Sequence, residues 1–302
     1  MLITRSCRTS WIPTVVVIVF STVGASTASS QSPARSGPAQ VGPESGALVA
    51  VGGAMQSPEI YQRFIQLAGG PDAHIVLIPT AGGGAEYDDS FRGLDAWREQ
   101  GARNLTLLHT MDPAVADTRD FVEPLKTASG VFFFGGRQWL LVDAYGGTAT
   151  EDELRKVLDR GGVIGGSSAG ASILASFLVR GDTETNEIMM GDHQRGFGYL
   201  RGVAIDQHVL RRNRQFDLIE VIEAHPQLLG IGIDEDTAII VRGDRFEVAG
   251  ASHVLIYDYR STTGADGKFY FLKPGQIFDM GLREVVAPQP MQNVERRPWS
   301  AN

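Results

Sequence analysis

The sequence predicts a doubly wound α/β fold with a mostly parallel sheet and a strand-rich C-terminal third. Three observations predict this class. Short apolar runs alternate along the chain with segments of helical period. These runs end in glycine-rich turns, as the buried strands of a parallel sheet do. The last third holds several strand-like runs and few helical ones. Alternating strands and helices are typical of a doubly wound sheet.

The parallel strands are expected at five short apolar runs. In chain order they are Ala47–Val51, Ile75–Ile78, Leu105–Leu108, Val131–Phe134 and Val163–Ile164.

Helical periodicity is clearest in two segments. In Thr150–Arg160, the leucines and valine at 154, 157 and 158 share one stripe behind an acidic first turn. Val209–Ala224 shows the same spacing and is expected as a second helix. We expect the strands of the final third to form an antiparallel edge of the same sheet. They are Thr237–Val241, Phe246–Ala249, His253–Tyr257 and Phe269–Leu272.

The two ends of the chain are expected to lie outside this fold. Two arginines precede an apolar run from Val15 to Val23, and residues 26–28 fit a small-x-small cleavage site. The run is much shorter than the roughly 20 residues that span a bilayer. We therefore interpret residues 1–28 as a signal peptide and not as a membrane anchor. This predicts a secreted or periplasmic protein with no membrane association after cleavage.

The rest of the chain divides by composition. Residues 29–45 are rich in Ser, Pro, Gly and Gln and are expected as a flexible leader. Residues 46–286 are expected as a single α/β domain, and residues 287–302 as a flexible, proline-containing tail.

Composition and charge exclude several classes of protein. The 302 residues are 43% hydrophobic and 21% charged, which is ordinary for a globular domain and not for a coiled coil or a disordered chain. The formal net charge is −8 and no segment is dense in Lys or Arg, so a nucleic-acid partner is not expected. Cys7, the only cysteine, precedes the cleavage site. The mature chain would therefore have no disulfide and no thiol nucleophile.

The strongest chemical motif is Gly-Ser-Ser-Ala-Gly at residues 166–170. It follows the strand Val163–Ile164 and opens a segment, Ala171–Leu178, that we expect to be helical. G-x-S-x-G between a strand and a helix is a nucleophile elbow, a tight turn that lifts the hydroxyl of Ser168 above the sheet. The alternative is a phosphate-binding turn, but this segment has neither a Walker lysine nor the G-x-G-x-x-G spacing. The motif favours a serine nucleophile.

A serine nucleophile needs a base within hydrogen-bond reach. His208 follows a short apolar run and is expected at the carboxyl end of a strand, on the same sheet edge as the serine; His193 is the second choice. The acid that orients the base is expected between serine and histidine in the chain. Asp182, Glu184 and Glu187 all qualify by position, and spacing does not choose among them.

Four motifs in fixed order carry a resemblance to a known family. They are Gly-Gly-Arg-Gln at 135–138, Gly-Gly-Ser-Ser-Ala-Gly-Ala at 165–171, Asp-Gln-His at 206–208 and Gly-Ile-Asp-Glu-Asp-Thr at 232–237. From about residue 47 to residue 260, the chain resembles the cyanophycinase and aspartyl dipeptidase family of serine peptidases. That family is similar in fold to class I glutamine amidotransferases, with serine in place of their cysteine.

The resemblance also implies roles for single residues. Those of the catalytic step are Ser168 as nucleophile, His208 as base, Gly136 and Ala169 as oxyanion N–H donors, and Asp182 or, next, Glu184 as the orienting acid. Positions that line the family's substrate pocket are matched by Gln138, Asp206, Gln207 and Arg212.

One position departs from the family pattern. Asp217 stands where cyanophycin-cleaving members carry an arginine. On a helix it would lie about 140° round from Arg212. We expect it to be free to face a basic substrate group or solvent.

Asp234, Glu235 and Asp236 are candidate ligands of a cation. Three acids in one turn cannot all point the same way, and no H-x-x-x-H or similar ligand spacing is present. We therefore expect no metal and no cofactor.

These observations predict an exported serine-type peptidase whose substrate is a peptide or isopeptide containing aspartate. It would hydrolyse an amide or isopeptide bond next to that aspartate through an acyl-enzyme. Two alternatives stay open: an aspartyl or isoaspartyl dipeptidase without polymer activity, and a catalytically inactive binding protein on the same fold. A homodimer is also left open.

Overall fold

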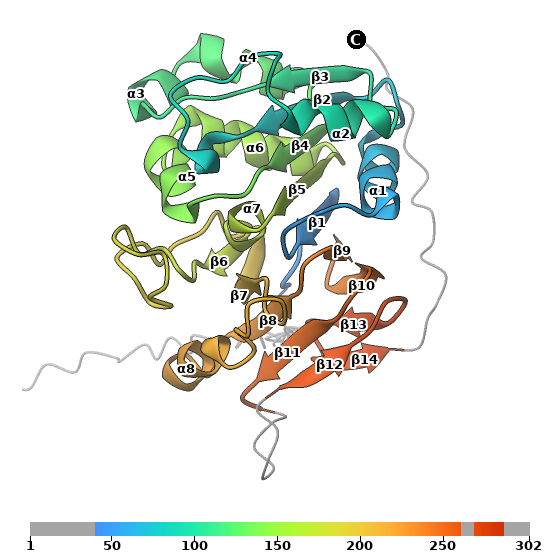
Figure 1. Cartoon of the computed structure of the whole chain (residues 1–302), viewed down its shortest axis with the longest axis vertical. Helices are drawn as coiled ribbons and strands as arrows, with labels where there is room; N and C mark the ends of the chain where they lie inside the picture. The colour runs from blue at the N-terminus through green and yellow to red at the C-terminus, as the bar shows by residue number, and fades with distance from the viewer. Residues whose placement is uncertain (1–39, 261–268, 287–302) are drawn as a thin grey trace, which may run out of the picture. The chain divides into compact units, whose positions relative to one another are not determined.

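The computed structural model describes residues 40–260 and 269–286 (Figure 1). The expected signal peptide (1–28), the leader up to residue 39 and the tail (287–302) lie outside the described residues, so these assignments and the export stay predictions. None of the described helices is long and apolar enough to cross a membrane.

The helical elements are mostly short. They are α1 (Pro58–Ala68), η1 (Thr80–Gly82, a 3₁₀ turn), α2 (Gly93–Glu99), α3 (Pro113–Ala116), α4 (Arg119–Thr127), α5 (Gln138–Tyr145), α6 (Ala149–Asp159), α7 (Ala169–Ser172) and α8 (Asp217–Ala224).

The strands belong to two sheets. They are β1 (Ala47–Val51), β2 (His74–Ile78), β3 (Asn104–Leu107), β4 (Gly130–Phe133), β5 (Val163–Ser167), β6 (Ala175–Phe177), β7 (Leu200–Gln207), β8 (Leu229–Ile233), β9 (Thr237–Arg242), β10 (Arg245–Gly250), β11 (Val254–Asp258), β12 (Tyr270–Leu272), β13 (Ile277–Asp279) and β14 (Glu284–Val286).

The larger sheet has the strand order β14-β13-β10-β9-β1-β5-β4-β2-β3. The five predicted strands β1 to β5 pair in parallel. β9 runs antiparallel to β1, and β10, β13 and β14 extend this antiparallel edge. The predicted class, α/β with a mostly parallel sheet, is confirmed. β5 and β1 lie at the centre, so the turns after them sit where ligands bind in open α/β sheets.

The second sheet was not predicted. Its order is β12-β11-β8-β7-β6, with β6, β7 and β8 parallel and β11 and β12 antiparallel. The expectation that His253–Tyr257 and Phe269–Leu272 join the first sheet is wrong, because they correspond to β11 and β12. An apolar run shows that a strand is buried, but not which neighbour it pairs with.

Apolar side chains pack on both faces of the larger sheet. One face is covered by α1 and α2, where Phe64, Trp97 and Phe132 make edge-to-face ring contacts. The opposite face packs against α4 to α7 and against one side of the second sheet (Figure 1). The outer side of the second sheet is covered by α8. Both sheets are therefore buried, which holds the ends of β5, β7 and β8 in fixed positions.

Two predicted helices are shorter than expected. The segment Ala171–Leu178 leaves the helix after Ser172 and continues as β6, which pairs with β7. Helix α8 begins only at Asp217, and residues 208–216 form turns. In those turns the backbone N–H groups of Leu210 and Arg211 donate to the carboxylate of Asp234. A distant side chain thus satisfies donors that a helix would have used.

Candidate active site

Ser168 lies on the sharp turn between β5 and α7. Its φ and ψ of 56° and −117° are a conformation that residues with a side chain rarely adopt. The two glycines of the motif make the turn sterically allowed. A Cβ on Gly166 would lie 2.1 Å from the carbonyl oxygen of Gly170, and a Cβ on Gly170 would lie 2.2 Å from the oxygen of Phe133. The structure thus has the nucleophile-elbow geometry that the motif predicts.

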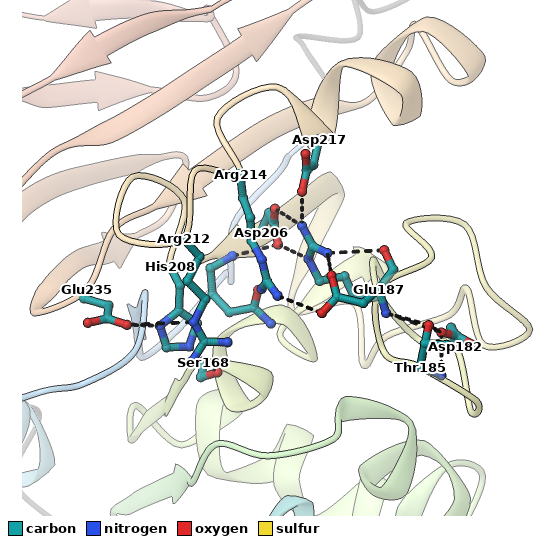
Figure 2. Close-up of polar contacts among 12 residues, drawn as sticks. Ser168, Asp182, Thr185, Glu187, Asp206, His208, Arg212, Arg214, Asp217 and Glu235 are labelled. Carbon is teal, nitrogen blue, oxygen red and sulfur yellow. Dashed lines mark hydrogen bonds and ion pairs between the residues drawn. The ribbon is translucent and has the colours of Figure 1, made fainter.

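The imidazole of His208 lies directly against this serine. Nε2 of His208 is 2.8 Å from Oγ of Ser168, so the predicted pair is brought together from β5 and the end of β7 (Figure 2). The two strands belong to different sheets, so the expectation that both residues lie on the same sheet edge is wrong. The backbone N–H of His208 donates to the oxygen of Gly52. Gly53 leaves the space for the ring, because a Cβ there would lie 2.0 Å from Cε1 of His208.

The acid at His208 is Glu235, which the sequence analysis had considered only as a cation ligand. Oε1 of Glu235 is 2.7 Å from Nδ1 of His208. A carboxylate can only accept here, so Nδ1 carries the hydrogen and Nε2 is free to accept the proton of Ser168. The carboxylate comes from the turn after β8, at the same sheet edge as β7. That position at a strand end is the signal that could have identified it.

The expectation that Asp182 or Glu184 would hold His208 is therefore corrected. Asp182 is buried, and its carboxylate accepts from the backbone N–H groups of Glu184, Thr185 and Glu187 and from the hydroxyl of Thr185. The Thr185 hydroxyl and these N–H groups hold the pKa of Asp182 well below its usual range. Glu184 is exposed. Figure 2 shows Asp182 at the opposite end of the polar network from His208.

Burial is the main influence on the pKa of His208 and lowers it below the ordinary value. Glu235 raises this pKa, whereas the cationic side chains of Arg212 and Arg214 lower it. The balance keeps the imidazole neutral near neutral pH, which is the state that can accept a proton.

The two predicted oxyanion donors lie beside Ser168. Ala169 is the first residue of α7, so its N–H has no partner within the helix and lies at the positive end of the helix. Gly135, the neighbour of Gly136, also lies against Ser168, because a Cβ on Gly135 would lie 3.5 Å from Oγ of Ser168. The assignment of the N–H groups of Gly136 and Ala169 as oxyanion donors stays a prediction.

Gln138 and Gln207 are almost fully buried near the ends of their elements, α5 and β7. Nε2 of Gln138 donates to the oxygen of Val179 at 2.7 Å. Within the described part of the chain, Oε1 of each glutamine is buried without a hydrogen-bond partner. Buried acceptors without a partner are uncommon and costly. The expectation that these two side chains line a substrate pocket stays a prediction.

Asp206 does not present its carboxylate to the site as expected. It is fully buried and bound by Arg180, with Nε to Oδ1 at 2.8 Å and Nη2 to Oδ2 at 3.1 Å. Arg180 is 1% exposed and also donates to Asp217 at 2.5 Å. The expectation that Asp217 faces substrate or solvent freely is therefore wrong. Arg180 could not be predicted from the sequence, because no sequence pattern marks a single buried arginine.

This ion network predicts a large stability effect. We expect Arg180→Met to lower the free energy of unfolding by about 3–5 kcal/mol, because it leaves the buried carboxylate of Asp206 without a counter-charge. Chemical denaturation measures the loss. Asp217→Asn should cost less, since Asp206 keeps both of its bonds to Arg180. Equal, small losses for both variants would contradict a stabilising network.

The structure also separates the three acids weighed as a metal site. Asp234 accepts from Leu210, Arg211 and Ser252, Glu235 accepts from His208, and Asp236 accepts from Gln56 and Ser57. Their carboxylates thus have different protein partners and do not converge. Among the residues described, no group of three or more His, Cys, Asp or Glu side chains is placed to hold a metal ion.

A serine on a strand–helix elbow, bonded to an imidazole that a carboxylate holds from its other side, is the arrangement of a serine hydrolase. The sequence model of peptidase family S51 matches residues 48–249. The chain belongs to this family of serine-type peptidases.

Two curated relatives support the family, and a solved structure supports the fold. A cyanophycinase from Geminocystis herdmanii is 33% identical over 218 residues, which cover 70% of this chain and 80% of that protein. A cyanophycinase from Synechococcus elongatus is 35% identical over 227 residues, covering 72% and 70%. A peptidase from an acI-B1 actinobacterium has a similar fold, with a TM-score of 0.56 and 24% identity, over 80% of this chain and 98% of that one.

Proposed function

We propose that this peptidase hydrolyses an amide or isopeptide bond next to an aspartyl residue through an acyl-enzyme. The observation that carries the proposal is the position of Arg212. Its backbone N–H donates to the oxygen of His208. Its side chain is 51% exposed, with Nε 4.0 Å from Oε1 of Glu235, the acid at His208. A planar guanidinium suits a substrate carboxylate. The likeness to two cyanophycinases supports the same class of substrate.

The chemistry follows from the contacts of Ser168. Its oxygen bonds to the substrate carbonyl carbon while its proton passes to Nε2 of His208. The N–H groups of Gly136 and Ala169 stabilise the oxyanion. The carbon–nitrogen bond then breaks, and His208 returns the proton to the leaving amine. Water attacks the acyl-enzyme by the same route in reverse, which releases the acid and restores the serine.

The test is a substrate screen with the full mature chain. Cyanophycin, β-Asp-Arg and Asp-X dipeptides are incubated with the wild type and with Ser168→Ala, and released amines are quantified. Cleavage by the wild type alone is expected. A fluorophosphonate probe should label the wild type and not Ser168→Ala. Labelling without cleavage of any aspartyl substrate would refute the proposed substrate class while retaining a reactive serine. No labelling and no cleavage would favour the inactive binding protein.

Arg212→Lys tests the role of the guanidinium. We expect KM for an acidic substrate to rise roughly tenfold, since lysine keeps the charge but loses the planar pair of donors. A neutral ester should be cleaved with unchanged kcat and KM. Steady-state kinetics on both substrates measure this difference. Equal losses on both would mean that Arg212 supports the fold and does not hold a carboxylate.

A further inference from the structure

The loop between β6 and β7 presents a carboxylate, that of Glu187, toward the arginines of the site (Figure 2). The backbone of Glu187 is fixed, because its N–H donates to Asp182 at 3.3 Å and its carbonyl oxygen accepts from Arg180 at 3.3 Å. Its side chain is nevertheless 67% exposed. The loop thus anchors the main chain of Glu187 and leaves its carboxylate able to move.

The carboxylate of Glu187 lies against two guanidinium groups. Oε1 is 3.3 Å from Nη2 of Arg214, and Oε2 is 3.7 Å from Nη1 of Arg180. Arg180 is already bound by Asp206 and Asp217. Arg214 differs, because Glu187 supplies its closest described ion pair. The main electrostatic partner that Glu187 neutralises is therefore Arg214.

Arg214 is a largely buried cation near His208. Its side chain is only 11% exposed, although the neighbouring Arg212 is 51% exposed. Burial lowers the pKa of Arg214, as do Arg180 and Arg212, whereas Asp206 and Glu187 raise it. The cation also lies near enough to His208 to lower the pKa of that imidazole. A partly buried cation close to the reacting pair favours a carboxylate partner.

The bond between Glu187 and Arg214 is easily replaced. Ion pairs with an exposed partner contribute little, because water screens them and the side chain loses freedom. A substrate carboxylate bound through other contacts can take the same guanidinium, and Glu187 then returns to water. We propose that Glu187 is a specificity-determining residue that occupies Arg214 in the free enzyme and competes there with the carboxylate of an acidic substrate.

This inference rests on the proposed function, since it assumes an acidic ligand at the site. It assigns Glu187 an effect on binding and none on the chemical step. An acidic ligand must displace the carboxylate of Glu187 from Arg214, whereas a neutral ligand need not. Glu187 therefore weakens the binding of acidic groups that contact Arg214 alone, and selects those that engage further partners as well.

Binding to an inactive enzyme tests this directly. The probe is N-acetyl-L-aspartate, with N-acetyl-L-asparagine amide as its uncharged counterpart, titrated by calorimetry into Ser168→Ala. Adding Glu187→Gln should tighten the binding of N-acetyl-L-aspartate roughly three- to tenfold and leave the neutral probe unaffected. The matched control is Glu184→Gln, the same change at an exposed position of the same loop, which should alter neither.

A double-variant comparison separates competition from a general charge effect. In an Arg214→Met background, Glu187→Gln should no longer tighten binding, because the contested guanidinium is absent. In the active enzyme, Glu187→Gln should lower KM for an acidic substrate and leave kcat unchanged.

Three results would overturn the inference: equal tightening by Glu184→Gln, tightening that persists without Arg214, or no binding of N-acetyl-L-aspartate with or without Glu187. Failure of the wild type to cleave aspartyl substrates is measured separately and bears on the proposed function alone.

Discussion

Ser168→Ala is expected to lower kcat by at least about 10³-fold, because the members of a catalytic triad act as a unit and the loss of one removes their joint effect. The hydroxyl of Ser168 is the group 2.8 Å from Nε2 of His208. The substitution by alanine removes this oxygen and leaves Cβ and the backbone atoms of the turn in place. Initial rates of amine release from an aspartyl dipeptide, at saturating substrate, measure the loss.

Ser167→Ala is the matched control, since it deletes the same hydroxyl one residue earlier. Ser167 is the last residue of β5, and no described hydrogen bond joins its hydroxyl to His208, whereas Oγ of Ser168 lies 2.8 Å from Nε2 of His208. We therefore expect kcat to fall less than about threefold. If Ser167→Ala lost most of its activity while Ser168→Ala stayed active, Ser167 and not Ser168 would be the nucleophile.

The parallel half of the fold could be predicted because it depends on local patterns. The run Ala47–Val51 became β1 with the same bounds, and the helix expected at Thr150–Arg160 is α6, Ala149–Asp159. The burial of a strand or of one face of a helix can be inferred from the pattern of apolar residues in the sequence. The second sheet could not be predicted in this way. Its β8 and β11 are buried throughout, and their pairing depends on contacts distant in sequence.

The predicted helix ends are wrong where tertiary contacts override helix propensity. Residues 209–216 have helical spacing, yet Asp234 binds the N–H groups of Leu210 and Arg211, and Asn213 takes a φ of 53°. Arg212 and Arg214 of this turn lie near His208 (Figure 2). A local pattern contains no information about a carboxylate more than twenty residues away.

The residues of the site that belong to a recognisable sequence motif could be predicted. Ser168 and His208 were identified from a strand–helix elbow and a strand end, and the structure brings them together. The acid does not lie between Ser168 and His208 in the chain, where it was expected. Folding imposes no such order, since any turn at the same sheet edge can supply a carboxylate. Glu235 follows β8, the parallel neighbour of β7.

Glu235→Gln is expected to lower kcat by roughly 10³- to 10⁴-fold, although glutamine has nearly the same shape. The carboxylate accepts the Nδ1 hydrogen of His208 and thereby leaves Nε2 able to take the proton of Ser168. The amide of glutamine can instead donate to Nδ1, which would place the ring hydrogen on Nε2. An imidazole in that form cannot act as the base.

The same variant should change the pH profile of kcat/KM. The neutral form of His208 is active, so the rate of the wild type rises as pH increases through the pKa of His208 and then levels. Glu235 raises this pKa, whereas burial lowers it. Removing the carboxylate should therefore lower the pKa further and move the acid limb of the residual activity to lower pH.

Asp182→Asn is the matched comparison for Glu235→Gln. It makes the same change, from carboxylate to amide, at the acid that the sequence favoured. Asp182 binds the backbone of its own loop at residues 184–187, and no described contact joins it to His208. Its loss should loosen that loop and change kcat by less than about tenfold, with the acid limb unmoved, since a residue acting only on loop order does not alter the charge at the base. If Asp182→Asn abolished kcat while Glu235→Gln kept a normal rate and pH profile, the carboxylate at His208 would not be the orienting acid. The 2.7 Å contact between Glu235 and Nδ1 predicts the opposite order.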